Sequence, residues 1–192
     1  MKILLTSDWP VSAVNGVAIS IMNLYKELKK LGHDVKVLSL SDNSDFYKDG
    51  DFYYVKSFEI HIYPEVRATL HFHNKYVNEL VKWKPDIVHS QCEFFTYSIA
   101  NTIAARSSCP IVHTYHTLYE HYTSYVLANE KITKPLLHQL IKWRLKDADL
   151  VIAPTEKVYS RLEGLVNGHI EIMPTGIDLS KYDNPPDQLE IS

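Results

Sequence analysis

Short apolar runs alternate with longer amphipathic segments over most of the chain. The first run, Ile3-Leu4-Leu5, precedes a polar loop, and apolar residues then recur at helical spacing up to Leu31 before Gly32 ends the helix. Strand-length apolar runs follow at 35–40, 52–55, 58–63, 86–90, 110–114, 149–154 and 170–174. Helical spacing covers 17–31, 70–83, 98–107, 131–146 and 156–166. This alternation predicts an α/β fold, with a doubly wound and mostly parallel sheet that carries helices on both faces.

Two stretches of the chain lack this periodicity. Residues 41–50 are polar and predict a loop. Residues 183–187, Asp-Asn-Pro-Pro-Asp, are acidic, rich in proline and without apolar side chains, as linkers and frayed termini are. We therefore expect one domain over residues 1–182 and a linker or frayed tail over 183–192.

Composition limits the location and the partners. The formal net charge is -3 at pH 7 and no basic tract is interleaved with aromatic residues, so we expect no nucleic-acid partner. Two cysteines, Cys92 and Cys109, are too few for a disulfide framework, which favours a reducing cytoplasm. The sequence turns polar at Thr6, so we expect no signal peptide, and no apolar run is long enough to cross a bilayer. Any membrane contact should be peripheral.

The loop from Thr6 to Val17 is the first candidate for chemistry. Ligands of open α/β sheets bind outside the carboxyl ends of the strands, and the following helix would point its free N–H groups and positive dipole end there, which favours a phosphate. The loop is not a dinucleotide or Walker fingerprint, because Gly16 is its single glycine and no Gly-Lys-Ser/Thr follows. The alternative is an ordinary turn in which Asn15-Gly16 serves the backbone dihedral angles.

The segment from Thr114 to Tyr122 is the second candidate. It follows a predicted strand directly and is dense in threonine, histidine, tyrosine and glutamate, which bind hydroxyl groups. His116 is the predicted active-site residue, whereas His113 alternates to the other face of the strand and should lie in the core or bond to the backbone. The spacing of His113, His116 and His121 fits no standard zinc pattern, so no metal site is expected. A hydrolase is not favoured either, because no Gly-x-Ser-x-Gly elbow is present.

The predicted helix over 131–146 is the third candidate. Apolar residues share one side of it, namely Leu136, Leu137, Leu140, Ile141 and Trp143. Basic residues gather on the other, namely Lys131, Lys134, His138, Lys142 and Lys146. Such a helix can lie on an anionic membrane through its lysines, or it can pack on the core with a solvated lysine face, and the pattern leaves both open. Arg144 falls among the apolar positions and should have a carboxylate or phosphate partner.

Five motifs occur in an order that resembles the GT4 glycosyltransferases. They are the 2–31 unit with Asn15-Gly16-Val17, Pro-Asp-Ile-Val-His at 85–89, Thr-Tyr-His-Thr at 114–117, the 147–156 segment Asp-Ala-Asp-Leu-Val-Ile-Ala-Pro-Thr-Glu, and Pro-Thr-Gly-Ile-Asp at 174–178. The resemblance covers residues 1 to about 182 and implies a Rossmann-like domain that forms one half of a GT-B architecture. The version of the third motif here further resembles the bacterial enzymes that glucosylate diacylglycerol.

The resemblance implies roles for single residues on the donor side. Asn15, Gly16 and Val17 would bring backbone N–H groups close to the donor diphosphate. His116 would contact the transferred sugar and help to position the acceptor.

On the acceptor side, the resemblance implies a group of residues around the entrance and the neighbouring strand end. Tyr119, Glu120 and Tyr122 would line the acceptor entrance, and Thr155 and Glu156 would face the cleft.

The resemblance also implies partners. Gly176 and Asp178 would mark the crossing into a C-terminal domain that binds the nucleotide sugar, which is expected to be UDP-glucose. No segment of the 192 residues matches that domain. The chain alone is therefore expected to be inactive, because the charge of the departing diphosphate must be offset. A retaining enzyme that is peripheral on the cytoplasmic face of the cell membrane, with a diacylglycerol-type acceptor, is the leading interpretation.

Two alternatives remain open. One is a GT4 transferase with a soluble acceptor, whose lysine helix faces water. The other is a flavodoxin-like binding module without enzymatic activity, which predicts a closed polar surface at the strand ends instead of an open half-cleft.

Overall fold

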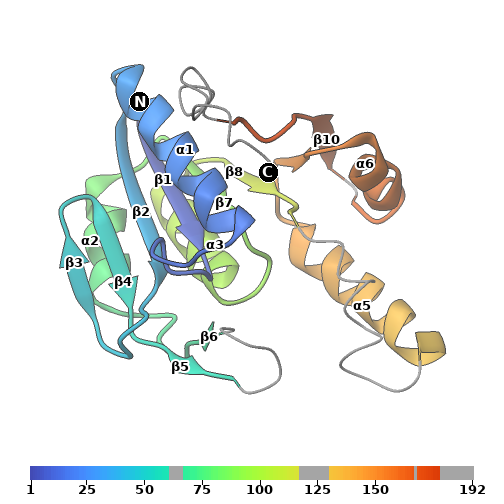
Figure 1. Ribbon diagram of the computed structural model, residues 1–192, viewed down its shortest axis with the longest axis horizontal. Helices are drawn as coiled ribbons and strands as arrows, with labels where there is room; N and C mark the ends of the chain where they lie inside the picture. The colour runs from blue at the N-terminus through green and yellow to red at the C-terminus, as the bar shows by residue number, and fades with distance from the viewer. Residues whose placement is uncertain (61–66, 117–129, 167, 178–192) are drawn as a thin grey trace, which may run out of the picture.

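An eight-stranded sheet runs through the centre of the protein (Figure 1). The computed structural model describes residues 1–60, 67–116, 130–166 and 168–177. The strand order is β10-β9-β8-β7-β1-β2-β4-β3, and the ladders are parallel except that between β3 and β4. The strands are β1 (Lys2–Ser7), β2 (Asp34–Leu40), β3 (Tyr47–Asp49), β4 (Phe52–Val55), β7 (Ile87–Ser90), β8 (Ile111–Thr114), β9 (Leu150–Ala153) and β10 (His169–Ile172). The helices are α1 (Gly16–Lys30), α2 (Lys75–Trp83), α3 (Phe95–Ser107), α5 (Glu130–Leu145) and α6 (Glu156–Leu162).

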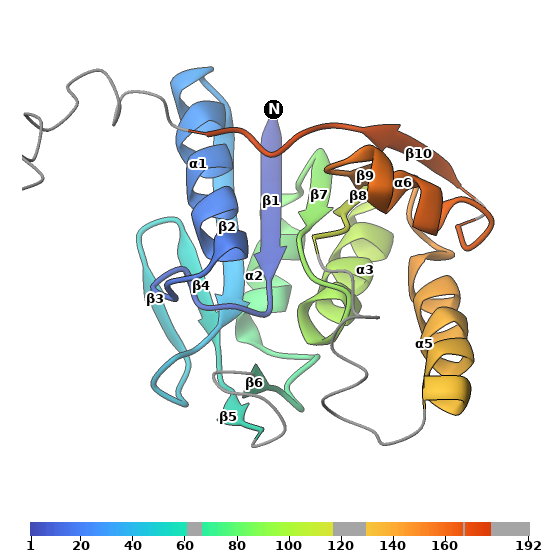
Figure 2. The ribbon, with the colours of Figure 1, turned by 45° about the vertical axis from the view of Figure 1, so that its right-hand side comes forward.

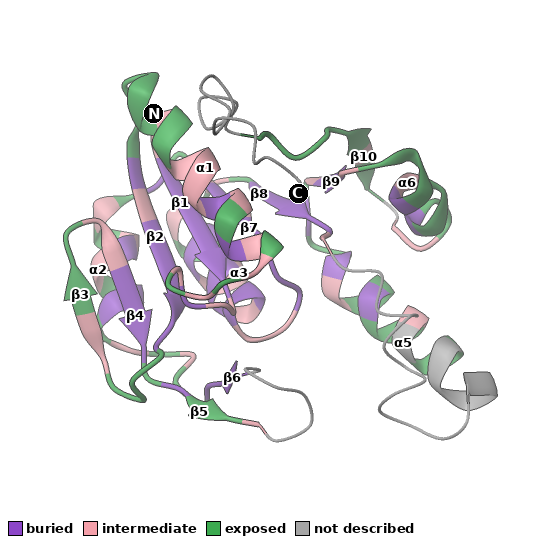
Figure 3. Cartoon of the chain, in the orientation of Figure 1, coloured by how far each residue is buried: buried purple, intermediate pink, exposed green. Residues whose placement is uncertain are grey.

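Successive residues of β1 belong to two separate apolar clusters, one on each face of the sheet. Ile3 and Leu5 pack with Ile21 of α1, while Leu4 packs with Leu80 of α2 and Ile103 of α3 on the opposite face (Figure 2). Figure 3 shows the central strands as the most buried part of the chain. Strands buried on both faces explain the unbroken apolar runs in the sequence. The predicted doubly wound parallel sheet is therefore confirmed.

Two predicted helices are shorter than their periodicity indicated. Helix α2 begins at Lys75 and not near residue 70, because the side chain of Asn74 accepts the N–H groups of Tyr76 and Val77 at 2.9 and 3.1 Å. Helix α6 ends at Leu162 and not near residue 166, and Gly164 follows it with a φ of 83°.

The predicted loop over 41–50 contains an unexpected edge strand. Residues Tyr47–Asp49 form β3, which pairs antiparallel with β4. The rings of Tyr47 and Tyr54 stack across this pair with centroids 4.0 Å apart. The cross-strand aromatic contact stabilises a segment whose own sequence is too polar to predict a strand.

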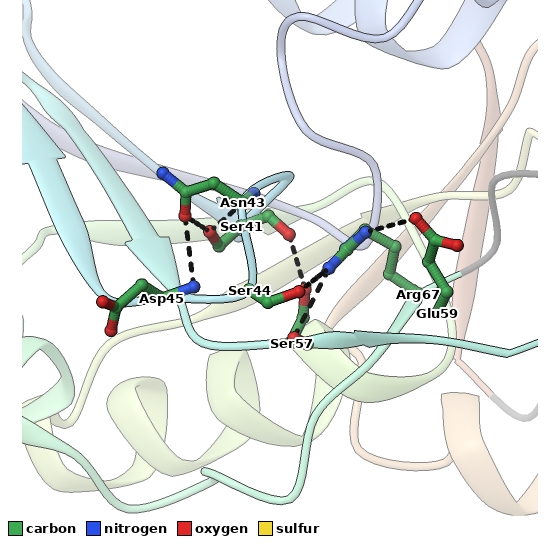
Figure 4. Close-up of polar contacts among 7 residues, drawn as sticks. All are labelled: Ser41, Asn43, Ser44, Asp45, Ser57, Glu59 and Arg67. Atoms are coloured by element: carbon green, nitrogen blue, oxygen red, sulfur yellow. Dashed lines mark hydrogen bonds and ion pairs between the residues drawn. The ribbon is translucent and has the colours of Figure 1, made fainter.

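A buried arginine fixes a small ribbon at the carboxyl ends of β2 and β4. The ribbon consists of β5 (Phe58–Glu59) and β6 (Arg67–Ala68), and Arg67 is 7% exposed. Its guanidinium donates to the hydroxyls of Ser57 and Ser44, both at 2.7 Å, and to the carboxylate of Glu59 at 3.2 Å (Figure 4). The Ser57 hydroxyl in turn donates to the carbonyl of Ser41. The ribbon is thus tied to the edge of the sheet at which ligands bind in this class of fold.

The chain order places a topological switch point beside β1. From β1 the chain continues to β2 on one side, and after α2 it returns to β7 on the other side. Connections that leave in opposite directions open a crevice at the carboxyl ends of such neighbouring strands. This edge is the place to look for a site.

Candidate functional site

The carboxyl ends of β1, β7 and β8 form a connected polar floor at the switch point. The backbone N–H of Gln91, directly after β7, donates to the carbonyl of Thr6 in β1 at 2.9 Å. The side chain of Gln91 meets His116, two residues past the end of β8, with 2.6 Å between Oε1 and Nε2. Residues far apart in the sequence are therefore joined at one edge of the sheet.

His116, the predicted active-site residue, is half-buried at this edge. Burial lowers the pKa of His116 to about 4, and the nearby Glu93 carboxylate opposes this only in part. The imidazole is therefore neutral at physiological pH. A neutral ring carries one N–H, which can donate a hydrogen bond, and one lone pair, which can accept one.

His113 and Glu93 form a buried pair at the same edge of the sheet. His113 is fully buried and its Nε2 lies 3.1 Å from the Glu93 carboxylate, while the ring of Tyr97 meets it edge-on at 5.3 Å. His113 thus lies in the core as predicted, but its side-chain partner is a carboxylate rather than the backbone. Both members of the pair act electrostatically on His116.

The opposite face of the same strands carries a second histidine contact. His89 of β7 lies 2.8 Å from the Thr114 hydroxyl of β8, measured from Nε2 to Oγ1. Burial lowers the pKa of His89 to about 3, so this ring is also neutral.

The N-terminus of α1 lies at the same edge of the sheet (Figure 2). The side chain of Asn15 accepts the N–H of Ala18 at 2.9 Å and so caps the helix. Gly16 is exposed, its φ is not in the left-handed region, and no heavy atom lies within 4 Å of the Cβ that a larger residue would add. The interpretation of Gly16 as a residue chosen for its dihedral angles is therefore wrong. A Cβ at this position would point into open space.

Asp8 links this loop to α3. Its carboxylate accepts the N–H groups of Thr96 at 2.6 Å and Phe95 at 3.3 Å, and so caps a helix whose own N-cap side chain makes no such bond. Burial raises the pKa of Asp8 to about 6 in spite of these donors. The sequence did not reveal this cap, since about 87 positions separate the partners.

The remaining predicted site residues are distributed as follows. Thr155 and Glu156 are exposed at the end of β9, where Thr155 caps α6 by accepting the N–H of Val158 at 3.2 Å. The predicted acceptor residues Tyr119, Glu120 and Tyr122 lie outside the described residues, as do Asp178 and residues 183–192. Gly176 is exposed.

Helix α5 does not bury the apolar side that its pattern predicted. Leu136, Leu140 and Trp143, spaced by four and three residues, are 67%, 38% and 56% exposed, while Ile141 and Leu145 pack on the core. Among the described side chains of α5, the buried ones lie in the C-terminal half of the helix (Figure 3). An apolar stripe, defined by Leu136, Leu140 and Trp143, therefore faces outward.

Basic groups border this apolar stripe. Lys142 and Lys146 are exposed, whereas the side chains of Lys131 and Lys134 lie outside the described residues. Among the described residues, Arg144 donates to the Ser98 hydroxyl at 2.7 Å, and its guanidinium lies 4.9 Å from the ring of Trp143. Among the helices of the described ranges, none has the length and hydropathy to cross a bilayer.

A hollow at the amino-end edge of the sheet is not part of this site. The hollow lies at the edge of the sheet opposite to His116, and its lining includes Lys2, Asp34, Lys84, Asp86 and Cys109. Within the described part of the chain, no group of three or more histidine, cysteine, aspartate or glutamate side chains is placed to hold a metal ion.

Comparison with known proteins gives a consistent result. Residues 14–181 match the Glycosyltransferase Family 4 domain. The chain is 32% identical over 187 residues to an alpha-monoglucosyldiacylglycerol synthase of Streptococcus pneumoniae, covering 96% of the chain and 42% of that protein. It is 29% identical to the synthase of the same name from Acholeplasma laidlawii, covering 95% of the chain and 48% of that protein. The chain thus spans less than half the length of these relatives.

The solved structures show the fold. Sucrose-phosphate synthase from Thermosynechococcus elongatus superposes with a TM-score of 0.59 at 17% identity, over 93% of this chain and 49% of that one. The catalytic domain of starch synthase IV from Arabidopsis thaliana gives 0.53 at 13% identity, over 94% and 52%. Both likenesses cover about half of a larger glycosyltransferase. With most of its length matched by the family domain, this chain belongs to Glycosyltransferase Family 4.

Proposed function

We propose that the chain is the acceptor-side half of a retaining glycosyltransferase that moves a hexose, glucose, from UDP-glucose to a diacylglycerol-type lipid. The observation that carries the proposal is the neutral His116, held by Gln91 at the switch point, at the same sheet edge as the N-terminus of α1. The names of the two bacterial relatives support the lipid acceptor and the glucosyl group.

Each side of the edge has a role in this proposal. The first N–H groups of α1, at Gly16 and Val17, approach the donor diphosphate because the helix end favours an anion and no side chain blocks Gly16. His116 contacts the transferred sugar with an uncharged ring, which does not repel the positive charge that develops at the sugar carbon. A C-terminal domain binds the nucleotide and offsets the charge of the leaving diphosphate.

The acceptor side faces the lipid. In the proposal Tyr119, Glu120 and Tyr122 line the entrance, and Thr155 and Glu156 border it at the neighbouring strand end.

Helix α5 places the acceptor side on the membrane. Its apolar stripe, with Lys142 and Lys146 beside it, has the leucine, tryptophan and lysine chemistry of helices that lie in the interface of an anionic bilayer. Lys131 and Lys134 belong to the same helix and add to its positive charge. The enzyme is thereby peripheral on the inner face of the cell membrane, and the lipid acceptor reaches His116 from that surface.

The test is glucose transfer by the longer protein that contains this chain and a donor-binding domain. We expect labelled glucose from UDP-glucose to appear in a glycolipid when diacylglycerol is supplied in anionic mixed micelles, and His116→Ala to lower kcat roughly 100-fold or more. His73→Ala, at an exposed histidine, is the matched control and should keep full activity. Transfer to a soluble sugar but not to the lipid would contradict the lipid acceptor, and an active His116→Ala enzyme would contradict the site.

A further inference from the structure

Gln91 is a buried polar residue to which neither the motifs nor the comparisons assign a role. Its side chain is 2% exposed although it belongs to the loop after β7. Its backbone N–H bonds to Thr6 of β1 and its Oε1 contacts His116 beyond β8, so one residue connects the ends of three adjacent strands. Glutamine is seldom so fully buried without a specific task for its amide.

The contact decides which nitrogen of His116 carries the proton. A neutral imidazole has two tautomers, and an amide oxygen at 2.6 Å accepts a hydrogen bond only if Nε2 holds the proton. The Nδ1 atom then carries the lone pair. The two other titratable side chains that act on the ring, Glu93 and His113, are partners of one another at 3.1 Å. Gln91 is thus the direct hydrogen-bond partner that fixes the ring.

The buried nitrogen of the same amide, Nε2, lacks a hydrogen-bond partner among the described residues. An unsatisfied buried donor costs roughly 1–3 kcal/mol, so its retention at a ligand-binding edge indicates that a bound oxygen completes it.

We propose that Gln91 is a positioning residue for His116: its side-chain oxygen holds the imidazole in the Nε2–H tautomer, so that the Nδ1 lone pair is the hydrogen-bond acceptor presented by the ring. The proposal rests on the proposed function for the use of that lone pair, which accepts a hydrogen bond from a hydroxyl group of the sugar or the acceptor. The geometric part concerns this chain alone.

The first test reads the tautomer directly. Nitrogen-15 NMR of the 192-residue chain at pH 7 should show His116 with a protonated Nε2 and an unprotonated Nδ1. In Gln91→Leu, which keeps the bulk but removes the acceptor, the ring should become a mixture of tautomers. In Gln91→Glu, whose carboxylate occupies the same place, the pKa of His116 should rise because a negative charge at hydrogen-bond distance favours the imidazolium.

A matched control uses the second histidine contact. Thr114→Val removes the hydroxyl that meets His89 and should change the His89 signals while those of His116 stay unchanged. Observation of Nδ1–H in the wild type, or a His116 tautomer unaltered in a folded Gln91→Leu chain, would overturn the proposal whatever the fate of the glucosyl transfer.

The second test is kinetic and uses the longer protein. Gln91→Leu should lower kcat roughly 10- to 100-fold with little change in KM for the nucleotide sugar, because a displaced ring spoils the reacting geometry more than donor binding. In Gln91→Glu the activity should fall as pH decreases, along the raised pKa of His116 measured by NMR. Equal kcat values in Gln91→Leu and wild type, with the NMR result as expected, would refute the use of the lone pair and leave glucosyl transfer itself intact.

Discussion

The polar floor at the strand ends and the surface of α5 depart from ordinary burial in opposite directions. At the strand ends, Asp8, Gln91, Glu93, His113 and His116 are wholly or largely removed from water, and each has a hydrogen-bonding partner. On α5, three large apolar side chains remain in water. Neither arrangement is what burial energetics alone would select, since polar groups lose hydration when buried and apolar groups gain by burial.

The difference teaches where function has shaped the chain. The polar floor keeps His116 neutral, and its hydrogen bonds offset the cost of removing these polar groups from water. The apolar stripe is not buried by the described part of the domain, so we infer that another surface covers it. Helix α1 provides the reference case, because its Ile21 is fully buried against the sheet.

The largest expected effect is the difference in folding stability between a substitution on the packed face of α1 and one on the exposed face of α5. Ile21→Ala in α1 should lower the free energy of unfolding by about 2–5 kcal/mol, because the surrounding core cannot close the cavity. Leu136→Ala on α5 should change it by less than about 0.5 kcal/mol. Urea denaturation of the two variants measures both, and a similar loss in each would show that the apolar stripe is packed in solution.

The polar floor predicts a particular pH dependence of stability. The folded-state pKa values of His89 and His116 lie below the ordinary value of 6.5, so the unfolded chain binds more protons and stability falls as the pH drops from 6.5 towards 4. The raised pKa of Asp8, about 6, has the opposite sign, because the folded chain binds the extra proton between about 4 and 6.

Removing the Asp8 carboxyl should therefore make the loss of folding stability at acidic pH steeper. Between pH 6 and pH 5 the free energy of unfolding of Asp8→Asn should decrease more steeply than that of the wild type, by about 1 kcal/mol per pH unit. Urea titrations at pH 7, 6 and 5 give the two slopes. Parallel slopes would show that the carboxyl of Asp8 titrates normally.

A smaller effect is expected at the N-terminal end of α1. Asn15→Ala removes the side-chain acceptor for Ala18 and should cost about 0.5–2 kcal/mol, while Asn15→Asp should retain the cap. Thermal unfolding of the pair is the measurement. Equal losses in the alanine and aspartate variants would indicate that the helix end is not capped by this residue.

The parallel strands of the eight-stranded sheet were predicted, because buried parallel strands are continuous apolar runs that need no long-range information. Of the predicted strand at 58–63, the described part forms only Phe58–Glu59, and β6 was missed. The start of α2 was missed because one cap at Asn74 overrides the periodicity of residues 70–74. Strand β3 was missed because its partner Tyr54 supplies the packing that its own sequence lacks.

The positions of the candidate site residues could be predicted only in part, for a similar reason. His116 followed from its place at a strand end, but its partner Gln91 lies 25 positions away and a polar residue after a strand does not name its contact. The spacing of apolar residues predicted an apolar side on α5. The local sequence does not determine whether that side contacts protein, water or lipid.

Vesicle binding tests most directly whether α5 brings the acceptor side to a membrane. The 192-residue chain should co-sediment with anionic phospholipid vesicles at low salt, and the triple substitution Leu136→Ser, Leu140→Ser and Trp143→Ser should weaken binding by roughly tenfold or more. Charge reversal at Lys131, Lys134 and Lys142 should weaken it in a salt-dependent manner. Ile19→Ser, at a 53% exposed isoleucine of α1, is the control and should bind as the wild type does. Equal binding of the wild type and the triple variant, or no binding by either, would contradict a membrane role for α5.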